Sequence, residues 1–282
     1  MTAIPASVAR TGQVRSADGT TIAFECSGEG PALLLVDGAL CYRESGPSRP
    51  LAARLTDRFT VYTYDRRGRG DSGDTASSSL QHEVEDIAAL LAEAGGSACV
   101  YGVSSGAALV MHAAAAGLPV ERIALYEAPF AVGADLRRAR AQYVQQMRDA
   151  LAADEPGDAV RLFLRHVGVP SFVVSLMRFM PAWSKLVGTA HTLPYDAAAL
   201  GDTDAEPPLT PGRWAGVRAP ALVLAGGKSP EWMLAAVRAT AAALPDAQLA
   251  TLDGQTHMVK PAALAPALAE FFGATQRRRP AS

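Results

Sequence analysis

Residues 97–116 read SACVYGVSSGAALVMHAAAA and contain the motif G-x-S-x-G at residues 102–106. Residues 97–101 form a short apolar run typical of a buried β-strand, and the Ala-rich residues 107–116 favour a helix. A serine in a tight strand-to-helix turn projects its hydroxyl above the sheet, and flanking glycines leave room for the strained backbone. The context therefore predicts that Ser104 is a nucleophile.

Similar apolar runs alternate with helical patterns along most of the chain. The expected strands cover residues 32–36, 59–64, 97–101, 122–126, 221–225 and 248–252. The expected helices between and after them cover residues 80–94, 107–116, 231–244 and 262–272. Such alternation is typical of βαβ units and predicts an α/β fold, with a mostly parallel sheet of about eight strands and helices on both faces. An Asp18-Gly19 turn between residues 13–15 and 22–25 predicts a leading antiparallel hairpin.

The alternation stops between residues 131 and 212, where several helical patterns and many prolines follow one another. We expect this stretch to be a helical cap over the carboxyl edge of the sheet, where open α/β sheets bind ligands. The core is then formed by residues 1–130 and 213–276. Residues 277–282 are expected to be a disordered basic tail.

Composition narrows the class of protein. The chain has 282 residues, of which 49% are hydrophobic and 19% charged, and a formal net charge of −2, so electrostatics gives no reason to expect nucleic acid or a membrane as partner. The three cysteines are far apart and form no C-x-x-C pair, which fits a reducing cytoplasm. Residues 1–23 lack a signal-peptide pattern, and no apolar stretch is long enough to span a bilayer. We expect a cytoplasmic protein that binds a small-molecule substrate, with a homodimer left open.

A serine nucleophile needs a general base. His257 lies in a late loop between the last expected strand and the last expected helix. In α/β proteins of this kind the chain order is nucleophile, acid, histidine, so a late loop histidine is the expected base. The other four histidines fall in expected helices or in the cap: His82, His112, His166 and His191.

Taken together, these features resemble the α/β-hydrolase superfamily over residues 13–272. Asp37-Gly38 follows an early strand, and residues 64–73 read YDRRGRGDSG, which is similar to the family's Y-D-x-R-G-x-G-x-S turn. The resemblance implies a serine hydrolase that works through an acyl-enzyme, without metal or organic cofactor. It also implies an oxyanion hole formed by the amides of Ala39 and Ser105.

Asp37 departs from the family pattern, which usually has His-Gly at this place. A carboxylate facing the oxyanion would repel it. Asp37 is therefore expected to point away, to be protonated, or to pair with a cation such as Arg66 or Arg67.

The triad acid is also absent from its usual place. The family usually has an Asp in the loop after the penultimate strand, where this chain has Ser229, and a serine cannot carry the charge that stabilises an imidazolium. Glu127 ends the strand beside the nucleophile strand, in a position similar to the acid of haloalkane dehalogenases. A glutamate in an apolar run is costly to bury without a partner such as a histidine. Glu127 is the favoured acid, and three alternatives stay open: Glu231, another residue, or no functional acid at all.

The expected function is cleavage of a small or medium-sized carboxylic ester, thioester or lactone. Leu40 and Met258, next to Ala39 and His257 in sequence, are expected to bind substrate. Met177 and Trp183 belong to an apolar cluster of the cap that either packs on the core or lines an acyl pocket. The same triad also serves acyltransferases, lyases and cofactor-free haloperoxidases, and a silent ligand-binding scaffold is the alternative outside enzymes.

Two further motifs carry no function. Residues 68–73 satisfy G-x-G-x-x-G, but no helix is expected to start inside them, as a dinucleotide fingerprint requires. Residues 82–86 begin like the zinc motif H-E-x-x-H but have Asp86 in place of the second histidine. Neither a cofactor nor a metal is expected.

Overall fold

The computed structural model describes residues 9–76, 78–201, 206–210 and 212–273, so the expected basic tail lies outside the described residues. Within them the chain forms one eight-stranded sheet in the order β1-β2-β4-β3-β5-β6-β7-β8. Strands β1 and β2 are antiparallel to their neighbours, and all other pairs are parallel. The strands are β1 Arg10–Arg15, β2 Thr21–Ser27, β3 Ala32–Val36, β4 Thr60–Tyr64, β5 Ala98–Val103, β6 Val120–Tyr126, β7 Ala221–Gly226 and β8 Ala247–Leu252.

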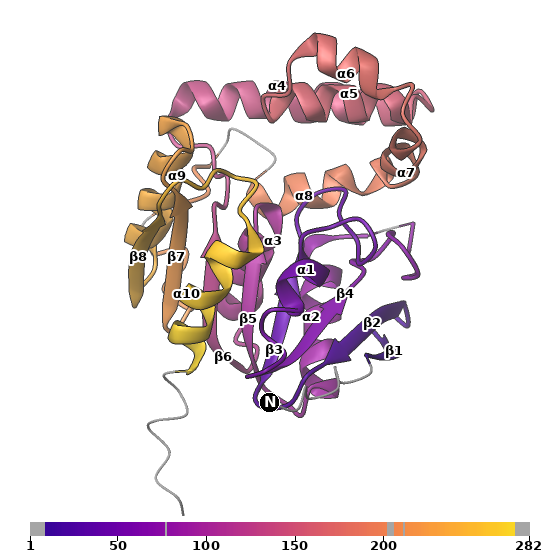
Figure 1. The fold of residues 1–282 in the computed structure, drawn as a ribbon. Helices are drawn as coiled ribbons and strands as arrows, with labels where there is room; N and C mark the ends of the chain where they lie inside the picture. Colours follow the sequence, from indigo (N-terminus) through magenta and orange to yellow (C-terminus); the bar gives the residue numbers. More distant parts are fainter. Residues whose placement is uncertain (1–8, 77, 202–205, 211, 274–282) are drawn as a thin grey trace, which may run out of the picture.

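Helices cover both faces of the sheet (Figure 1). Residues of α2 (Leu80–Glu93), α3 (Ser105–Ala115) and α9 (Glu231–Ala243) share one apolar core with the sheet. Residues of α1 (Ser48–Ala52) and α10 (Pro261–Gly273) form a second core on the other face. The central strands are buried on both sides, which is why they read as continuous apolar runs in the sequence.

The chain between β6 and β7 forms a helical roof above the carboxyl ends of the strands (Figure 1). Its elements are α4 Ala134–Ala152, α5 Pro156–His166, α6 Ser171–Met177, α7 Ala182–Gly188, the 3₁₀ turn η1 Ala190–Thr192 and α8 Leu193–Leu200. Helix α8 lies directly on the core, and its residues Ala199 and Leu200 belong to the same apolar cluster as α3. Helices α4, α5 and α6 lie farther out.

The expected fold class is confirmed, including the leading hairpin. The ten expected strands and helices of the core begin and end within two residues of the observed ones. Helix α1 was not expected because its five residues carry too few turns for a recognisable pattern. None of the helices in the described part of the chain is both long and apolar enough to cross a bilayer.

Candidate active site

Ser104 lies at the sharp turn from β5 to α3. Its backbone has φ 57° and ψ −129°, a conformation that is strained for a residue with a side chain. A Cβ on Gly106 would come within 2.4 Å of the Val36 carbonyl oxygen, so only glycine lets the helix start this close to β3. The Ser104 side chain lines a cavity and donates no hydrogen bond to another described residue. The hydroxyl is therefore free to meet a ligand.

His257 and Glu127 are hydrogen bonded although they lie 130 residues apart in sequence. The Nδ1 atom of His257 lies 2.9 Å from Oε2 of Glu127. Glu127 follows β6 directly, has φ 47°, and is fully buried, whereas the His257 side chain is 37% exposed. The strained backbone turns the carboxylate toward the loop that carries the histidine.

The His257 loop is held in place by β6 and β7. The Tyr126 hydroxyl donates to the carbonyl of Thr256 at 2.6 Å, and the Lys228 amide donates to the carbonyl of Gln255 at 2.8 Å. These bonds fix the two residues before the histidine. The ring is therefore placed by strand ends and not by the loop alone.

The second oxygen of Glu127 is also satisfied. Oε1 accepts from the Gly226 amide at 2.7 Å and from the Ser229 hydroxyl at 2.6 Å. Ser229 occupies the place where the family usually has its acid, and here it donates to the acid that stands at β6. These two bonds hold the carboxylate in place, with its other oxygen, Oε2, facing the histidine.

Glu231, the alternative acid, makes no contact with His257. Its side chain is 76% exposed at the first turn of α9 and pairs with Arg238. An exposed ion pair of this kind is a surface feature.

The backbone amides of Ala39 and Ser105 lie near Ser104, and neither has an acceptor among the described residues. A Cβ placed on Gly38 would lie 3.0 Å from Cβ and 3.5 Å from Oγ of Ser104, so the loop after β3 runs directly beside the Ser104 side chain. The Arg69 guanidinium donates to the carbonyl of Gly38 at 2.7 Å. In a trans peptide the C=O and N–H point in opposite directions, so this bond turns the Ala39 N–H away from Arg69.

The carboxylate of Asp37 faces Ser48 and Gly46. It accepts a hydrogen bond from Ser48 at 2.7 Å, and a Cβ on Gly46 would lie 2.6 Å from Oδ2. Burial raises the pKa of Asp37 to about 6. Of the three alternatives left open for Asp37, pairing with Arg66 or Arg67 is not observed, because Arg66 donates to the backbone carbonyl of Asp37 and Arg67 pairs with Asp18 and Asp86.

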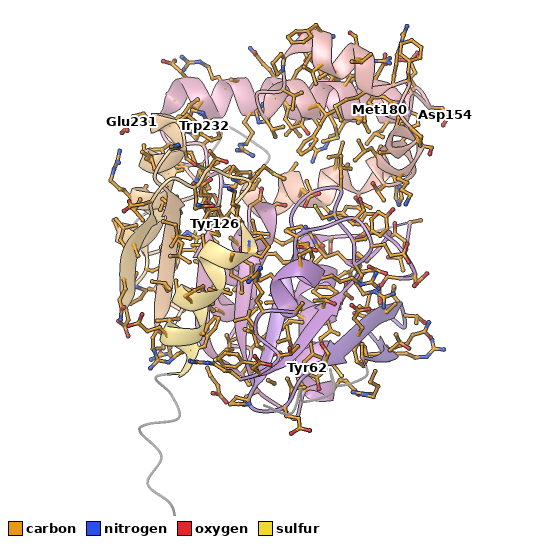
Figure 2. The ribbon with its side chains drawn as sticks, viewed as in Figure 1. Tyr62, Tyr126, Asp154, Met180, Glu231 and Trp232 are labelled. Atoms are coloured by element: carbon orange, nitrogen blue, oxygen red, sulfur yellow. The ribbon has the colours of Figure 1, made fainter. Side chains whose placement is uncertain are left out.

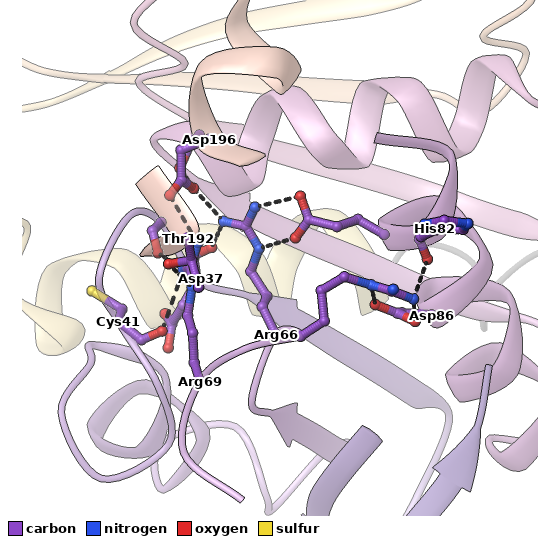
Figure 3. A network of polar contacts seen from close by, with 12 residues as sticks. Asp37, Cys41, Arg66, Arg69, His82, Asp86, Thr192 and Asp196 are labelled. Carbon is purple, nitrogen blue, oxygen red and sulfur yellow. Dashed lines mark hydrogen bonds and ion pairs between the residues drawn. The ribbon is translucent and has the colours of Figure 1, made fainter. Parts of the chain in front are cut away.

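A cluster of buried ions links the cap to the core beside the site (Figure 3). The Asp196 carboxylate on α8 accepts from Arg66 at 2.6 Å, from Arg69 at 2.8 Å and from the Ser105 hydroxyl at 2.7 Å. Burial alone would raise the pKa of Asp196, but the two guanidinium groups hold it below its ordinary value. The same arginines that contact the loop after β3 therefore also hold α8.

We expect Asp196→Asn to lower the free energy of unfolding by about 3–5 kcal/mol, because it leaves Arg69 buried without an anion. Urea unfolding followed by circular dichroism measures the change. The matched control is Asp135→Asn, which removes an exposed partner of Arg138 and should leave the unfolding curve almost unchanged. Equal curves for the two variants would show that the buried cluster does not hold the cap.

The cavity above Ser104 has a volume of about 510 Å³. Its floor comes from Ala39, Ser104, Ser105 and the segment after Glu127, and its far wall comes from α4, α5 and α8. Trp232, at the top of α9, lines it beneath α4 (Figure 2). The lining is mainly apolar, with Arg140, Tyr143, His166 and Asp196 as the residues that carry polar or charged groups from the cap.

The four expected substrate-binding residues do not line this cavity. Leu40 is buried in an apolar cluster with Val144 and Met147, and Met258 is 82% exposed. Met177 and Trp183 pack against a small apolar cluster inside the cap, formed by Val160, Leu164, Val174 and Ala190. The apolar character of these residues was not enough to predict which face of each cap helix lines the cavity.

The lining residues of α4 were missed by the sequence analysis. Leu136, Ala139, Arg140 and Tyr143 recur with helical spacing, so they lie on one face of α4. That periodicity was the available signal. Within the described residues, no cluster of histidine, cysteine or acidic side chains is placed to hold a metal ion.

Comparisons with known proteins all point to hydrolases. The sequence profile of the alpha/beta hydrolase family matches residues 32–267. A pimeloyl-[acyl-carrier protein] methyl ester esterase of Xanthomonas campestris pv. campestris is 32% identical over 239 residues, which is 82% of this chain and 89% of the relative.

Solved structures give the same result. An alpha/beta hydrolase from Sphaerobacter thermophilus superposes with a TM-score of 0.81 and 45% identity, over 93% of this chain and all (100%) of the other. A hydrolase from Pseudomonas aeruginosa superposes with a TM-score of 0.72 and 24% identity, over 94% and 98% of the two chains, and shows a shared fold alone.

Proposed function

The chain belongs to the alpha/beta hydrolase family and is a hydrolase enzyme, and on this premise we propose that it cleaves a small or medium-sized ester through Ser104, His257 and Glu127. The observation that carries the proposal is the hydrogen bond between the buried carboxylate of Glu127 and Nδ1 of His257. In the proposal the other ring nitrogen, Nε2, acts as the general base. The Ser104 amide donates to the carbonyl of Tyr126, the residue before Glu127, at 2.9 Å, so the turn that carries Ser104 lies beside the strand end that carries the acid.

In the proposed mechanism the proton is exchanged between Ser104 and His257, and Glu127 orients the histidine ring. Glu127 accepts a hydrogen bond from the Nδ1–H group of His257, which fixes the tautomer in which Nε2 carries a lone pair. Nε2 then removes the Ser104 proton as the oxygen attacks the ester carbonyl. The imidazolium so formed gives this proton to the leaving alcohol, and an acyl-enzyme remains. The hydrogen bond between serine and base is often long in ligand-free enzymes and tightens with substrate bound.

The negative charge on the carbonyl oxygen is met by two amides. In the proposal these are the N–H groups of Ala39 and Ser105, which have no acceptor of their own among the described residues. Arg69 supports one of them by binding the carbonyl of the same peptide. Removing one such donor from an enzyme typically costs about 3–4 kcal/mol of transition-state stabilisation.

The acyl-enzyme is then hydrolysed by the same groups. His257 takes a proton from water, the resulting hydroxide attacks the acyl carbonyl, and Ser104 recovers its proton. The named activity of the Xanthomonas relative supports ester cleavage as the class of reaction.

A fluorophosphonate probe and a short-chain para-nitrophenyl ester test the proposal. The native protein should release nitrophenol and should be labelled on Ser104, as mapped by mass spectrometry, whereas heat-denatured protein should not be labelled. A protein that neither hydrolyses the ester nor reacts with the probe would be a ligand-binding scaffold instead.

A further inference from the structure

Arg140 is a buried cation that lines the cavity from the cap. Arg140 is only 8% exposed and lies on the face of α4 that lines the cavity. Nη2 donates to the carbonyl of Pro129, while Nε is buried and has no hydrogen-bond partner. A guanidinium has five N–H donors, so most of its capacity is unused.

No carboxylate pairs with Arg140 among the described residues, although most other buried arginines of this protein have one. Burial lowers the pKa of Arg140 to about 10, which leaves it charged at neutral pH. Holding such a charge away from water without an anion costs several kcal/mol. A ligand with an anionic group would supply the missing partner of Arg140 and offset this free-energy cost.

The other charged groups of the cavity do not cancel this charge. Asp196 is already paired with Arg66 and Arg69. Desolvation and then the charge of Arg140 lower the pKa of His166, so its ring is neutral at pH 7 and stacks on Tyr143 with ring centres 4.2 Å apart. The positive charge of Arg140 on the cap side of the cavity is therefore not neutralised by the other lining groups.

From this arrangement we infer that the cavity takes an ester that carries an ionised carboxylate besides its scissile bond, and that Arg140 binds this carboxylate. The inference rests on the proposed esterase function. The apolar side chains of Leu136, Phe163 and Trp232 also line the cavity and suit an alkyl chain. The substrate class is thus a monoester of an apolar dicarboxylic acid, or an equivalent ester with one anionic end.

Kinetics with a matched pair of esters tests the inference. The first is the para-nitrophenyl monoester of adipic acid, and the second is the same ester with an isopropyl group in place of the carboxylate. We expect the wild-type protein to prefer the first by about 10- to 100-fold in kcat/KM, the range of a hydrogen bond to a charged group. Most of the preference should appear in KM.

Arg140→Met should remove this preference, and Arg140→Lys should keep part of it because the charge remains. Arg138→Met is the matched control, since Arg138 lies on the same helix, is exposed, and does not line the cavity. It should keep the full preference. The Arg140→Met protein should melt at or above the wild-type temperature, because an unpaired buried charge is gone. A wild-type protein without the preference, or an Arg140→Met protein that retains it, would overturn the inference.

Binding measurements separate this inference from the proposed function. In the Ser104→Ala protein, calorimetry with monomethyl adipate and with its isopropyl analogue measures recognition without turnover. Tighter binding of the carboxylate, lost in Ser104→Ala/Arg140→Met, supports the role of Arg140 even if no ester is hydrolysed. Turnover of neutral esters without any carboxylate preference supports the esterase and refutes the role of Arg140.

Discussion

Replacing either Ser104 or His257 with alanine is expected to lower kcat for an ester by about a million-fold, and replacing both is expected to lower it no further. The reason is that the two side chains act as one unit: without the base the hydroxyl is not activated, and without the hydroxyl the base has nothing to activate. The measurement is the rate of nitrophenol release by the two single variants and the double variant.

The comparison between single and double variants is the sharp part of this experiment. Because His257 is 37% exposed and contacts Glu127 through one nitrogen, its removal should leave the fold intact, which circular dichroism can check. Two losses that multiply would show that Ser104 and His257 act independently, and the proposed mechanism would then be wrong.

Glu127→Gln is expected to lower kcat by about ten-thousand-fold, as replacing the acid of a catalytic triad by its amide does in other serine enzymes. The glutamine oxygen can still accept from Gly226 and Ser229, so its NH₂ group must face Nδ1 of His257. A donor facing Nδ1 moves the ring proton to Nε2. The nitrogen that should take the serine proton is then blocked.

Glu231→Gln is the matched control for this variant. Glu231 is the other acid that the sequence allowed, and it is exposed and paired with Arg238. Its activity should stay within about twofold of the wild type, as is usual for surface substitutions away from a site. The reverse result, a silent Glu127→Gln and an inactive Glu231→Gln, would place the triad acid on α9.

Local patterns made the fold predictable. A parallel sheet covered on both faces produces apolar runs, and the turn after β5 has a sequence motif of its own. Glu127 could also be singled out, because an acid at the end of an apolar strand needs a partner.

The supporting contacts could not be predicted in the same way. Ser229 lies 102 residues from Glu127 in sequence, so nothing near it indicates that it donates to this carboxylate. The orientation of the cap helices could not be predicted either, because apolar residues occur on more than one face of the cap helices. Only the packing shows that Arg140 and Tyr143 line the cavity. Met177 and Trp183 pack within the cap instead.

The way the cap is attached bears on how this enzyme could diversify. Helix α8 is tied by ions to the loops that shape the catalytic floor, so exchanges there would disturb chemistry and stability together. The residues of α4 and α5 that line the cavity carry none of these contacts to Asp196, although Val144, Met147 and Ala159 of the two helices share an apolar cluster with Leu40 of the loop after β3 (Figure 1). Selection for new substrates can therefore act on the cavity-lining positions of α4 and α5, because exchanges there leave the ionic attachment of α8 in place.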